Sequence, residues 1–210
     1  MISEIVINEV LRESGIPAAW CSKRFADLQG NDEYLKQIEK IKAWDFKEPS
    51  SLFLNSDCGT GKTHLSMCLF RKFVIQNLNE LAEKFKDDYS FRAERMKYNC
   101  FYKESDLLSE IYVSYGNKKG NDENEIINRL VNLPILIIDD LFASRTNDNA
   151  RRVMLDLIDK RIDWHNRPTV ISSNWNLEKI AQEIDPRIAS RLASGLVFNL
   201  KNQTDYRIKK

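Results

Sequence analysis

The stretch SLFLNSDCGTGKT, residues 51–63, decides the fold of this chain. Its first five residues, Ser51–Asn55, are mostly apolar and predict a short buried strand. The following loop ends in Gly61-Lys62-Thr63, and residues 64–78 are apolar nearly all round, which indicates an enclosed helix. A glycine-rich loop between a strand and a helix is typical of proteins that bind phosphate groups.

The chemistry of such a loop favours small residues, because backbone N–H groups must wrap around a phosphate. Gly59 adds flexibility, while Ser56 stands where the pattern usually has its first glycine, and a serine resists positive φ. Lys62 can neutralise phosphate oxygens, and the Thr63 hydroxyl can ligate Mg²⁺. The candidate nucleotide-binding residues are Ser56, Asp57, Cys58, Gly59, Thr60, Gly61, Lys62, Thr63 and His64.

A second apolar run ends in two carboxylates. Residues 133–139 predict a strand buried on both faces, with Asp139 and Asp140 at its C-terminal end. In a parallel sheet this end faces the ligand crevice. We expect Asp139 to hold Mg²⁺ and Asp140 to orient or polarise an attacking water.

Two further patterns carry candidate catalytic residues. Residues 169–173 predict a strand that ends at Asn174, whose amide can bond a terminal phosphate or the water. Arg187 and Arg191 are spaced i, i+4 on one helix face, and an arginine aimed at a terminal phosphate stabilises the transition state. Supplied by a neighbouring subunit, it makes hydrolysis depend on assembly. A turn asparagine and a solvated helix face are the alternative interpretations.

The rest of the chain alternates strands with helices, which predicts an α/β fold with a parallel sheet. Gly195 suits the end of a helix. The remaining predicted elements are one or two helical turns in residues 1–14, helices over 32–44, 106–115, 149–165, 177–184 and 187–194, strands over 98–103 and 196–201, and a loop over 117–125.

Composition excludes several classes of protein. The chain has 210 residues and a formal net charge of +1, so no global charge field points to nucleic acid or membrane. The longest apolar run, residues 133–138, is far shorter than the ~18 residues of a membrane-spanning helix. The four cysteines show no C-x-x-C spacing, which favours reduced thiols over a zinc site. We expect a cytoplasmic protein with no membrane partner.

In this order, these patterns resemble the AAA+ ATPases of the DnaC/IstB group, which are bacterial and phage helicase loaders and transposition regulators. The resemblance implies an AAA+ P-loop NTPase fold of three layers, with a parallel five-stranded sheet and a reduced or absent helical lid, over residues 14–210 after a short extension, residues 1–13. The matching strings are SGIP (14–17), RFADL (24–28), CGTGKTHL (58–65), ILIIDDL (135–141), RPTVISSN (167–174), RIASRL (187–192) and DYR (205–207).

The resemblance also implies residue roles. Asn174 looks like sensor 1, and Arg191 looks like an arginine finger acting in trans, with Arg187 beside it. Arg207 looks like the sensor 2 arginine, which contacts the nucleotide, and Phe142 stands where family members often have glycine. The Walker A motif would include Lys62 and Thr63, and the Walker B motif Asp139 and Asp140.

By resemblance, the chain is an ATP-binding and weakly ATP-hydrolysing, Mg²⁺-dependent DNA-replication factor that cycles between ATP and ADP. It would assemble on single-stranded DNA as an oligomer with shared active sites and switch its binding to a replicative helicase with nucleotide state. Family loaders carry a separate helicase-binding domain, and here residues 1–13 or a helper protein would supply the docking. Lys118 and Lys119 lie near the segment that faces DNA in the family, although a solvated loop explains them equally.

Three other functions compete with this one. The nearest is an IstB-like ATPase that partners a transposase. A nucleotide-binding adaptor without turnover is the non-enzyme alternative, since Ser56 departs from the pattern and Asp140 is one methylene shorter than a glutamate. A nucleoside or nucleotide kinase also fits the chain length, but a kinase has no need for Asn174 or for the paired arginines.

Overall fold

The computed structural model describes residues 3–84, 100–115, 122–143 and 146–201. Five parallel strands form one sheet in the order β2-β3-β4-β1-β5. The parallel five-stranded sheet predicted from the sequence is therefore confirmed. The strands are β1 (Ser51–Asn55), β2 (Phe101–Lys103), β3 (Leu136–Asp139), β4 (Thr169–Ser173) and β5 (Leu196–Asn199).

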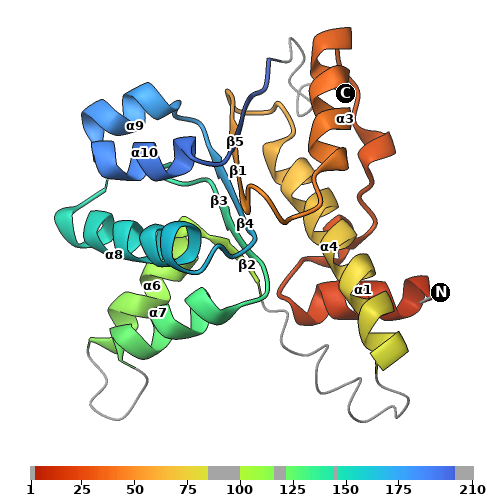
Figure 1. Ribbon diagram of the computed structural model, residues 1–210, viewed down its shortest axis with the longest axis horizontal. Coiled ribbons are helices and arrows are strands. Elements are labelled where there is room, and N and C mark those ends of the chain that lie inside the picture. The colour runs from red at the N-terminus through yellow and green to blue at the C-terminus, as the bar shows by residue number, and fades with distance from the viewer. Residues whose placement is uncertain (1–2, 85–99, 116–121, 144–145, 202–210) are drawn as a thin grey trace.

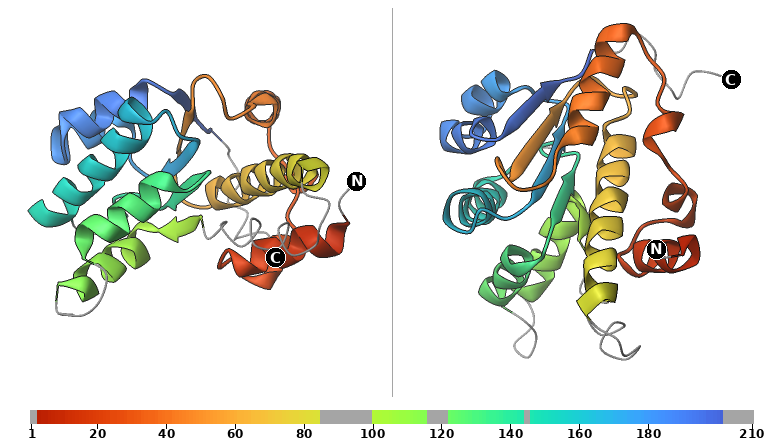
Figure 2. Two further views of the ribbon diagram at one scale, coloured as in Figure 1. Left: turned by 60° about the horizontal axis from the view of Figure 1, so that its bottom comes forward. Right: turned by 45° about the vertical axis from the view of Figure 1, so that its right-hand side comes forward.

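Helices cover both faces of this sheet, which gives three layers (Figure 1, Figure 2). On one side lie α1 (Glu4–Glu13), α3 (Asp32–Ala43) and α4 (Lys62–Lys84). On the other side lie α6 (Glu104–Ser114), α7 (Glu123–Asn132), α8 (Asp148–Asp159), α9 (Leu177–Glu183) and α10 (Pro186–Ala193). Two short elements, α2 (Ala18–Cys21) and the 3-10 turn η1 (Phe25–Asp27), lie between α1 and α3 in the chain.

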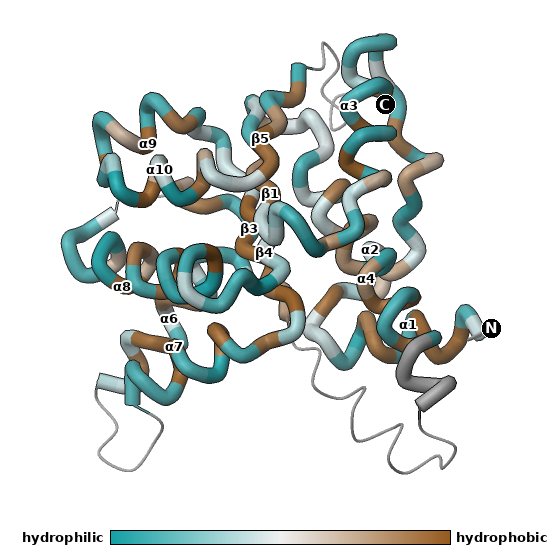
Figure 3. The backbone as a smooth tube through the Cα atoms, viewed as in Figure 1, coloured by the Kyte–Doolittle hydropathy of each residue, from teal (hydrophilic) through white to brown (hydrophobic). Residues whose placement is uncertain are grey.

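The core of the molecule is centred on the sheet. Every residue of β1, β3 and β4 is buried, which is why these strands are nearly continuous apolar runs rather than alternating ones. Figure 3 shows hydrophobic residues along the strands, while the outer turns of α8 and α9 are largely hydrophilic. Each fully buried aliphatic side chain contributes about 1.5–3 kcal/mol, so this arrangement fixes the strand ends where the site is built.

Several predicted boundaries differ from the structure, and three of the differences have a clear physical reason. Helix α1 spans ten residues rather than one or two turns, because Ser3 caps its N-terminus and Ile7, Val10 and Leu11 are buried. Strand β3 begins at Leu136 rather than at residue 133, since Leu133 caps the end of α7. The helix predicted over 149–165 is α8 followed by a π-helical turn, η2 (Lys160–Trp164).

The π-helical turn buries a charged side chain. Arg161 is fully buried and donates hydrogen bonds to the carbonyls of Leu130, Val131, Leu133 and Pro168. Burial lowers the pKa of this guanidinium to about 9. The hydrogen bonds of Arg161 reach the carbonyls at the C-terminal end of α7 as well as Pro168 and Thr169, so η2 ties that end to the start of β4.

Helix α7 was not expected, and the loop predicted over 117–125 is wrong for Glu123–Glu125. Asp122 and Glu125 form a capping box: the Asp122 carboxylate accepts the Glu125 N–H over 2.9 Å, and the Glu125 carboxylate accepts the Asp122 N–H over 3.2 Å. Ile126, Ile127 and Leu130 are buried on the inner face of the helix. The buried apolar side chains and the capping box stabilise a helix here, although the preceding residues are polar.

Gly195 follows α10 as predicted. The reason for a glycine at this position, however, is a close approach of the backbone to Ser51 and not a helix-ending turn. The described glycines with positive φ are Gly15, Gly59 and Gly61, so residue 195 has no left-handed turn. A Cβ atom at residue 195 would lie 2.1 Å from the Oγ of Ser51 and 2.5 Å from its carbonyl oxygen. The glycine therefore lets the chain pass directly over β1.

Among the helices that the structure describes, none is both long and apolar enough to cross a bilayer.

Candidate nucleotide-binding site

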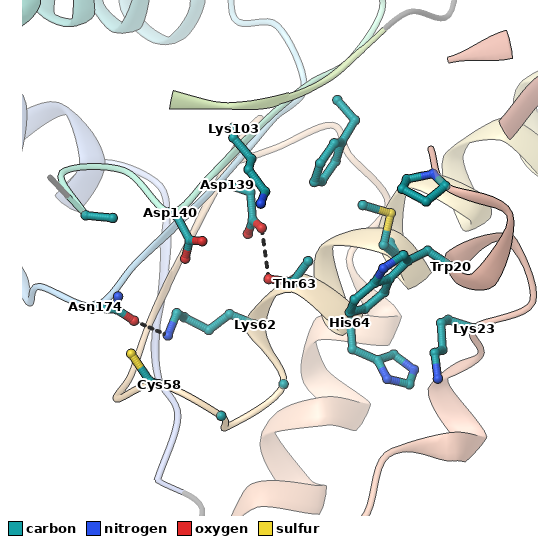
Figure 4. A pocket seen from close by; sticks show the side chains of 16 residues that line it. Trp20, Lys23, Cys58, Lys62, Thr63, His64, Lys103, Asp139, Asp140 and Asn174 are labelled. Atoms are coloured by element: carbon teal, nitrogen blue, oxygen red, sulfur yellow. Dashed lines mark hydrogen bonds between the residues drawn. The ribbon is translucent and has the colours of Figure 1, made fainter. Parts of the chain in front are cut away.

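A cleft of about 540 Å³ opens where β1, β3 and β4 end (Figure 4). Lys62 and Thr63 reach it from the start of α4, Asp139 and Asp140 from the end of β3, and Asn174 from the end of β4. The structure thus brings together groups that lie more than a hundred residues apart in the sequence. The carboxyl ends of parallel strands are the usual place for a ligand in an α/β sheet.

The loop between β1 and α4 has the backbone that phosphate binding requires. Gly59 and Gly61 have φ of 80° and 97°, values that side-chain-bearing residues rarely adopt. Ser56 is not among the residues with positive φ, and its hydroxyl pairs with that of Thr60. The serine therefore fits without backbone strain. From α3, the buried Tyr34 supports the loop by donating its hydroxyl to the Thr60 carbonyl over 2.9 Å.

Lys62 lies folded across this loop. Its Nζ donates to the carbonyls of Ser56 (2.8 Å) and Asp57 (3.0 Å) and to Oδ1 of Asn174 (2.7 Å). Burial lowers the pKa of Lys62, and the carboxylates of Asp139 and Asp140 act in the opposite direction. These three hydrogen bonds all go to uncharged oxygens, and a charged phosphate oxygen forms a stronger bond to an ammonium group.

Asp139 is held by two hydroxyl groups. Thr63 Oγ1 donates to Asp139 Oδ2 over 2.8 Å, and Ser172 Oγ donates to Oδ1 over 2.5 Å. Burial raises the pKa of Asp139, while both hydrogen bonds lower it. Ser172 also accepts the N–H of Asp140 over 3.1 Å, so one hydroxyl positions both carboxylates. Sequence reasoning missed Ser172, although it stands two residues before Asn174.

The turn after β3 has an unusual backbone. Asp140 and Phe142 have φ of 58° and 59°, in the left-handed region. Phe142 is fully buried, and its N–H donates to Glu104 Oε2 over 2.8 Å. A left-handed residue other than glycine costs about 1–2 kcal/mol, and burial of the ring with this hydrogen bond offsets it. This geometry explains why glycine is suited to position 142.

Glu104 is the first residue of α6 and is 4% exposed. Within the described residues, its Oε1 atom is buried without a hydrogen-bond partner. Burial raises the pKa of this carboxyl to about 7, and the bond from Phe142 opposes the shift. Glu104, which holds the turn beside Asp140 through the Phe142 N–H, therefore has a pKa near neutral pH.

The cleft has further walls that sequence reasoning did not assign. Trp20 and Lys23 line one side, with the Lys23 Nζ 5.9 Å from the centre of the Trp20 indole, and Lys103 lies at the end of β2 (Figure 4). His64 lines the cleft as predicted, but its Nε2 lies 2.9 Å from the Arg24 carbonyl oxygen, and burial lowers its pKa. No motif marks Lys103, because only the strand register brings it to the site.

The two candidate arginines lie on α10, away from the cleft of their own chain. Arg187 is 66% exposed and makes a bidentate pair with Asp185, at 3.0 and 2.8 Å. Arg191 pairs with Asp159 and, over 3.4 Å, with Asp163. Neither is among the residues that line the described cleft. Arg207, Lys118 and Lys119 lie outside the described residues.

No protein-family model matches the chain. The replicative helicase loader DnaC of Escherichia coli K12 is 22% identical over 154 residues, covering 71% of this chain and 54% of that protein. The chain thus spans about half the length of the curated relatives it matches. The crystal structure of DnaI has a TM-score of 0.63 at 17% identity, covering 90% of this chain and 95% of that one. AMPPCP-bound DnaA from Aquifex aeolicus has a TM-score of 0.61 at 16% identity, covering 89% and 52%.

The sheet, the phosphate-binding loop and the carboxylate pair at the end of β3 define a P-loop domain with the fold of the AAA+ ATPases. Within that class, the sequence match and the structural neighbours support a DnaC-family AAA+ ATPase domain. The resemblance predicted from the motifs is confirmed to this extent. The proteins that the chain is similar to are a replicative helicase loader and, among solved structures, DnaI and DnaA.

Proposed function

We propose that this chain binds and slowly hydrolyses ATP with Mg²⁺, as the motor domain of a helicase-loader-type replication factor. The observation that carries the proposal is the linked set of Lys62, Asn174, Thr63 and Asp139 in one cleft. It combines an ammonium group, a metal-ligating hydroxyl, a carboxylate and an amide at the end of adjacent strands. P-loop ATPases use these groups to bind a triphosphate and to position water.

The residues present fit both ATP and Mg²⁺. The left-handed Gly59 and Gly61 leave room for a phosphate close to the loop backbone. Thr63 and Asp139 would hold the metal, and hydroxyl and carboxylate oxygens are ligands that Mg²⁺ accepts. When bound, Mg²⁺ neutralises charge on the phosphates. Lys62 would exchange its carbonyl partners for phosphate oxygens, which its Nζ binds more strongly.

Three residues of this chain would serve hydrolysis itself. The Asp140 carboxylate would accept a hydrogen bond from the attacking water and align it. Asn174 would contact the terminal phosphate or that water, because its Oδ1 already lies 2.7 Å from Lys62 Nζ. Arg191, with Arg187 beside it, would act on the site of a neighbouring subunit. Active sites shared in this way make hydrolysis depend on self-assembly.

The partners follow from the relatives. One relative is named a replicative helicase loader, and a DnaA neighbour is described in complex with AMPPCP and single-stranded DNA. By analogy we propose that this chain assembles on single-stranded DNA in the cytoplasm and exchanges a replicative helicase as its nucleotide changes. Slow hydrolysis would then time the release of that partner.

The test is steady-state ATP hydrolysis by the full chain with and without single-stranded DNA, with Lys62→Ala as the blank. The account predicts Mg²⁺-dependent turnover that DNA stimulates and that the variant lacks. Phosphate transfer to a small acceptor would instead identify a kinase. Stoichiometric ATP binding without turnover, with and without DNA and a purified replicative helicase, would favour the adaptor.

A further inference from the structure

The edge strand β2 delivers a second lysine to the cleft. In the sheet, Tyr102 is the register partner of Ile138, and Lys103 is the partner of Asp139. Register partners on neighbouring parallel strands project their side chains to the same face. Figure 4 accordingly shows Lys103 extending from the end of β2 over Asp139 into the same cleft as Thr63. A cation therefore lies beside the predicted metal and water ligands.

The backbone that carries Lys103 is firmly anchored. Immediately before it, the Tyr102 hydroxyl accepts a 2.7 Å hydrogen bond from Arg129. Immediately after it, Glu104 accepts the N–H of Phe142 from the turn beyond Asp140. The position of residue 103 is thus set by both neighbours relative to Asp139 and Asp140. A side chain fixed at its base loses less freedom when its tip engages a ligand.

The ammonium group of Lys103, by contrast, has no ion-pair partner among the residues that the structure describes. Among the described residues, none pairs with it as an ion pair within 4.0 Å, whereas Lys62 donates to three residues of the site. Lys103 is also exposed to solvent at the cleft rim. A cation without a described partner, on an anchored strand end next to two carboxylates, suits a ligand that brings negative charge of its own.

The distribution of charge indicates which part of a nucleotide this would be. The glycines and Lys62 surround one end of the phosphate path, and Asp139 and Asp140 stand at the other. The terminal phosphate of a triphosphate would lie between Lys62 and those carboxylates, next to the Mg²⁺ that Thr63 and Asp139 would hold. A diphosphate places no group there. Lys103, the register partner of Asp139, reaches this end of the path from the neighbouring strand.

We propose that Lys103 binds the terminal phosphate of a nucleoside triphosphate in cis and so lets a single subunit distinguish the triphosphate from the diphosphate. The inference rests on the proposed function, since it requires that the cleft bind a nucleotide. It supplies positive charge from the chain itself, separately from the arginines on α10. Because Lys103 directly precedes α6, its contact with the terminal phosphate couples the presence of a triphosphate to the position of that helix.

The test compares the dissociation constants of a non-hydrolysable ATP analogue and of ADP, each with Mg²⁺, for the full chain. Lys103→Met should weaken the triphosphate analogue by about tenfold or more, the loss expected for one charge-assisted contact. Binding of ADP should change by less than about twofold. Lys103→Arg, which keeps the charge, should retain most of the preference. Lys36→Met, at an exposed site on α3, is the matched control and should change neither constant.

Three outcomes would overturn the inference. An equal loss for both nucleotides would show that Lys103 only supports the fold of the site. Unchanged constants would show that its ammonium group stays in solvent. Tighter binding of both nucleotides at low Mg²⁺ would mean that Lys103 competes with the metal instead. Failure of the proposed function looks different, because the unmodified chain would then bind neither nucleotide.

Discussion

The hydroxyl of Thr63 donates a 2.8 Å hydrogen bond to Oδ2 of Asp139, joining the first turn of α4 to the end of β3. The two oxygens come from segments 76 residues apart in sequence and meet at the floor of the cleft. The Ser172 hydroxyl occupies the other carboxylate oxygen, which leaves Asp139 oriented toward Thr63. A pair arranged in this way is suited to hold a divalent cation against phosphate oxygens.

Asp139→Asn should therefore raise the Mg²⁺ concentration needed for half-maximal nucleotide binding by about tenfold, because a neutral amide is a weaker ligand for a hard cation. A Mg²⁺ titration of fluorescent ATP analogue binding measures this midpoint. Asp32→Asn, which removes an exposed carboxylate from α3, is the control and should leave the midpoint unchanged. Equal midpoints for Asp139→Asn and the unmodified chain would remove Asp139 from the metal site.

Glu104 should make stability depend on pH. Its folded-state pKa is about 7, above the ordinary value of 4.5, so the folded chain holds this proton more tightly than the unfolded chain. The resulting stabilisation is complete below about pH 4.5 and is lost as pH rises through about 7, a total of about 3 kcal/mol. Glu104→Gln keeps an acceptor for the Phe142 N–H but does not titrate.

Urea unfolding of both proteins between pH 5 and pH 8 tests this. The free energy of unfolding of the unmodified chain should fall relative to Glu104→Gln across that range, by about 2 kcal/mol or more. Titration of other groups, including Asp139, cancels in the comparison because both proteins carry them. Parallel pH profiles would contradict the assignment.

Arg191→Ala should leave ATP binding intact and reduce assembly-dependent hydrolysis by about a thousandfold, because an arginine finger stabilises the transition state rather than the bound nucleotide. The ion pairs of Arg191 with Asp159 and Asp163 are partly exposed, so their loss should lower the unfolding free energy by only about 1 kcal/mol. Mixing Arg191→Ala subunits with Asp140→Asn subunits should restore turnover. If the mixture stays inactive, action in trans is not supported, and if ATP binding is lost, Arg191 works in cis.

Gly195→Ala should destabilise the fold without any change at the cleft. The new Cβ would lie 2.1 Å from the Ser51 Oγ and 2.5 Å from its carbonyl oxygen, so β1 and the end of α10 must move apart. Overpacking of this kind costs about 1–3 kcal/mol, measurable by urea unfolding. Gly30→Ala, at an exposed position, is the control. A loss of stability no greater than that of the control would mean that the backbone adjusts freely at residue 195.

Much of the site could be predicted because its groups stand at the ends of apolar runs. Asp139 ends one buried strand, Asn174 directly follows another, and Lys62 stands after the loop that leaves a third. Parallel strands bring such ends together. The need for glycine in the loop could also be predicted, and Gly59 and Gly61 do adopt positive φ. The local sequence was sufficient to predict these residues, because each strand is recognisable as an apolar run.

Other features depend on contacts that no local pattern records. Lys103 reaches the cleft only through the pairing of β2 with β3, and Glu104 acts through the N–H of Phe142, 38 residues away. Helix α7 was missed because its first turn, Glu123–Glu125, continues the polar stretch that precedes it. The π-helical turn places Arg161 among five hydrogen-bond acceptors that come from two other parts of the chain, residues 130–133 and 168–169.

The most direct test of the account is equilibrium binding of ATP, with and without Mg²⁺, to the unmodified chain and to Lys62→Ala, with Lys36→Ala as the control. The account predicts stoichiometric, Mg²⁺-enhanced binding to the unmodified chain and to Lys36→Ala. It predicts a loss of about a hundredfold or more in Lys62→Ala, because in the proposed site the buried ammonium group would contact the phosphates directly. Equal ATP affinity in the unmodified chain and Lys62→Ala would contradict it.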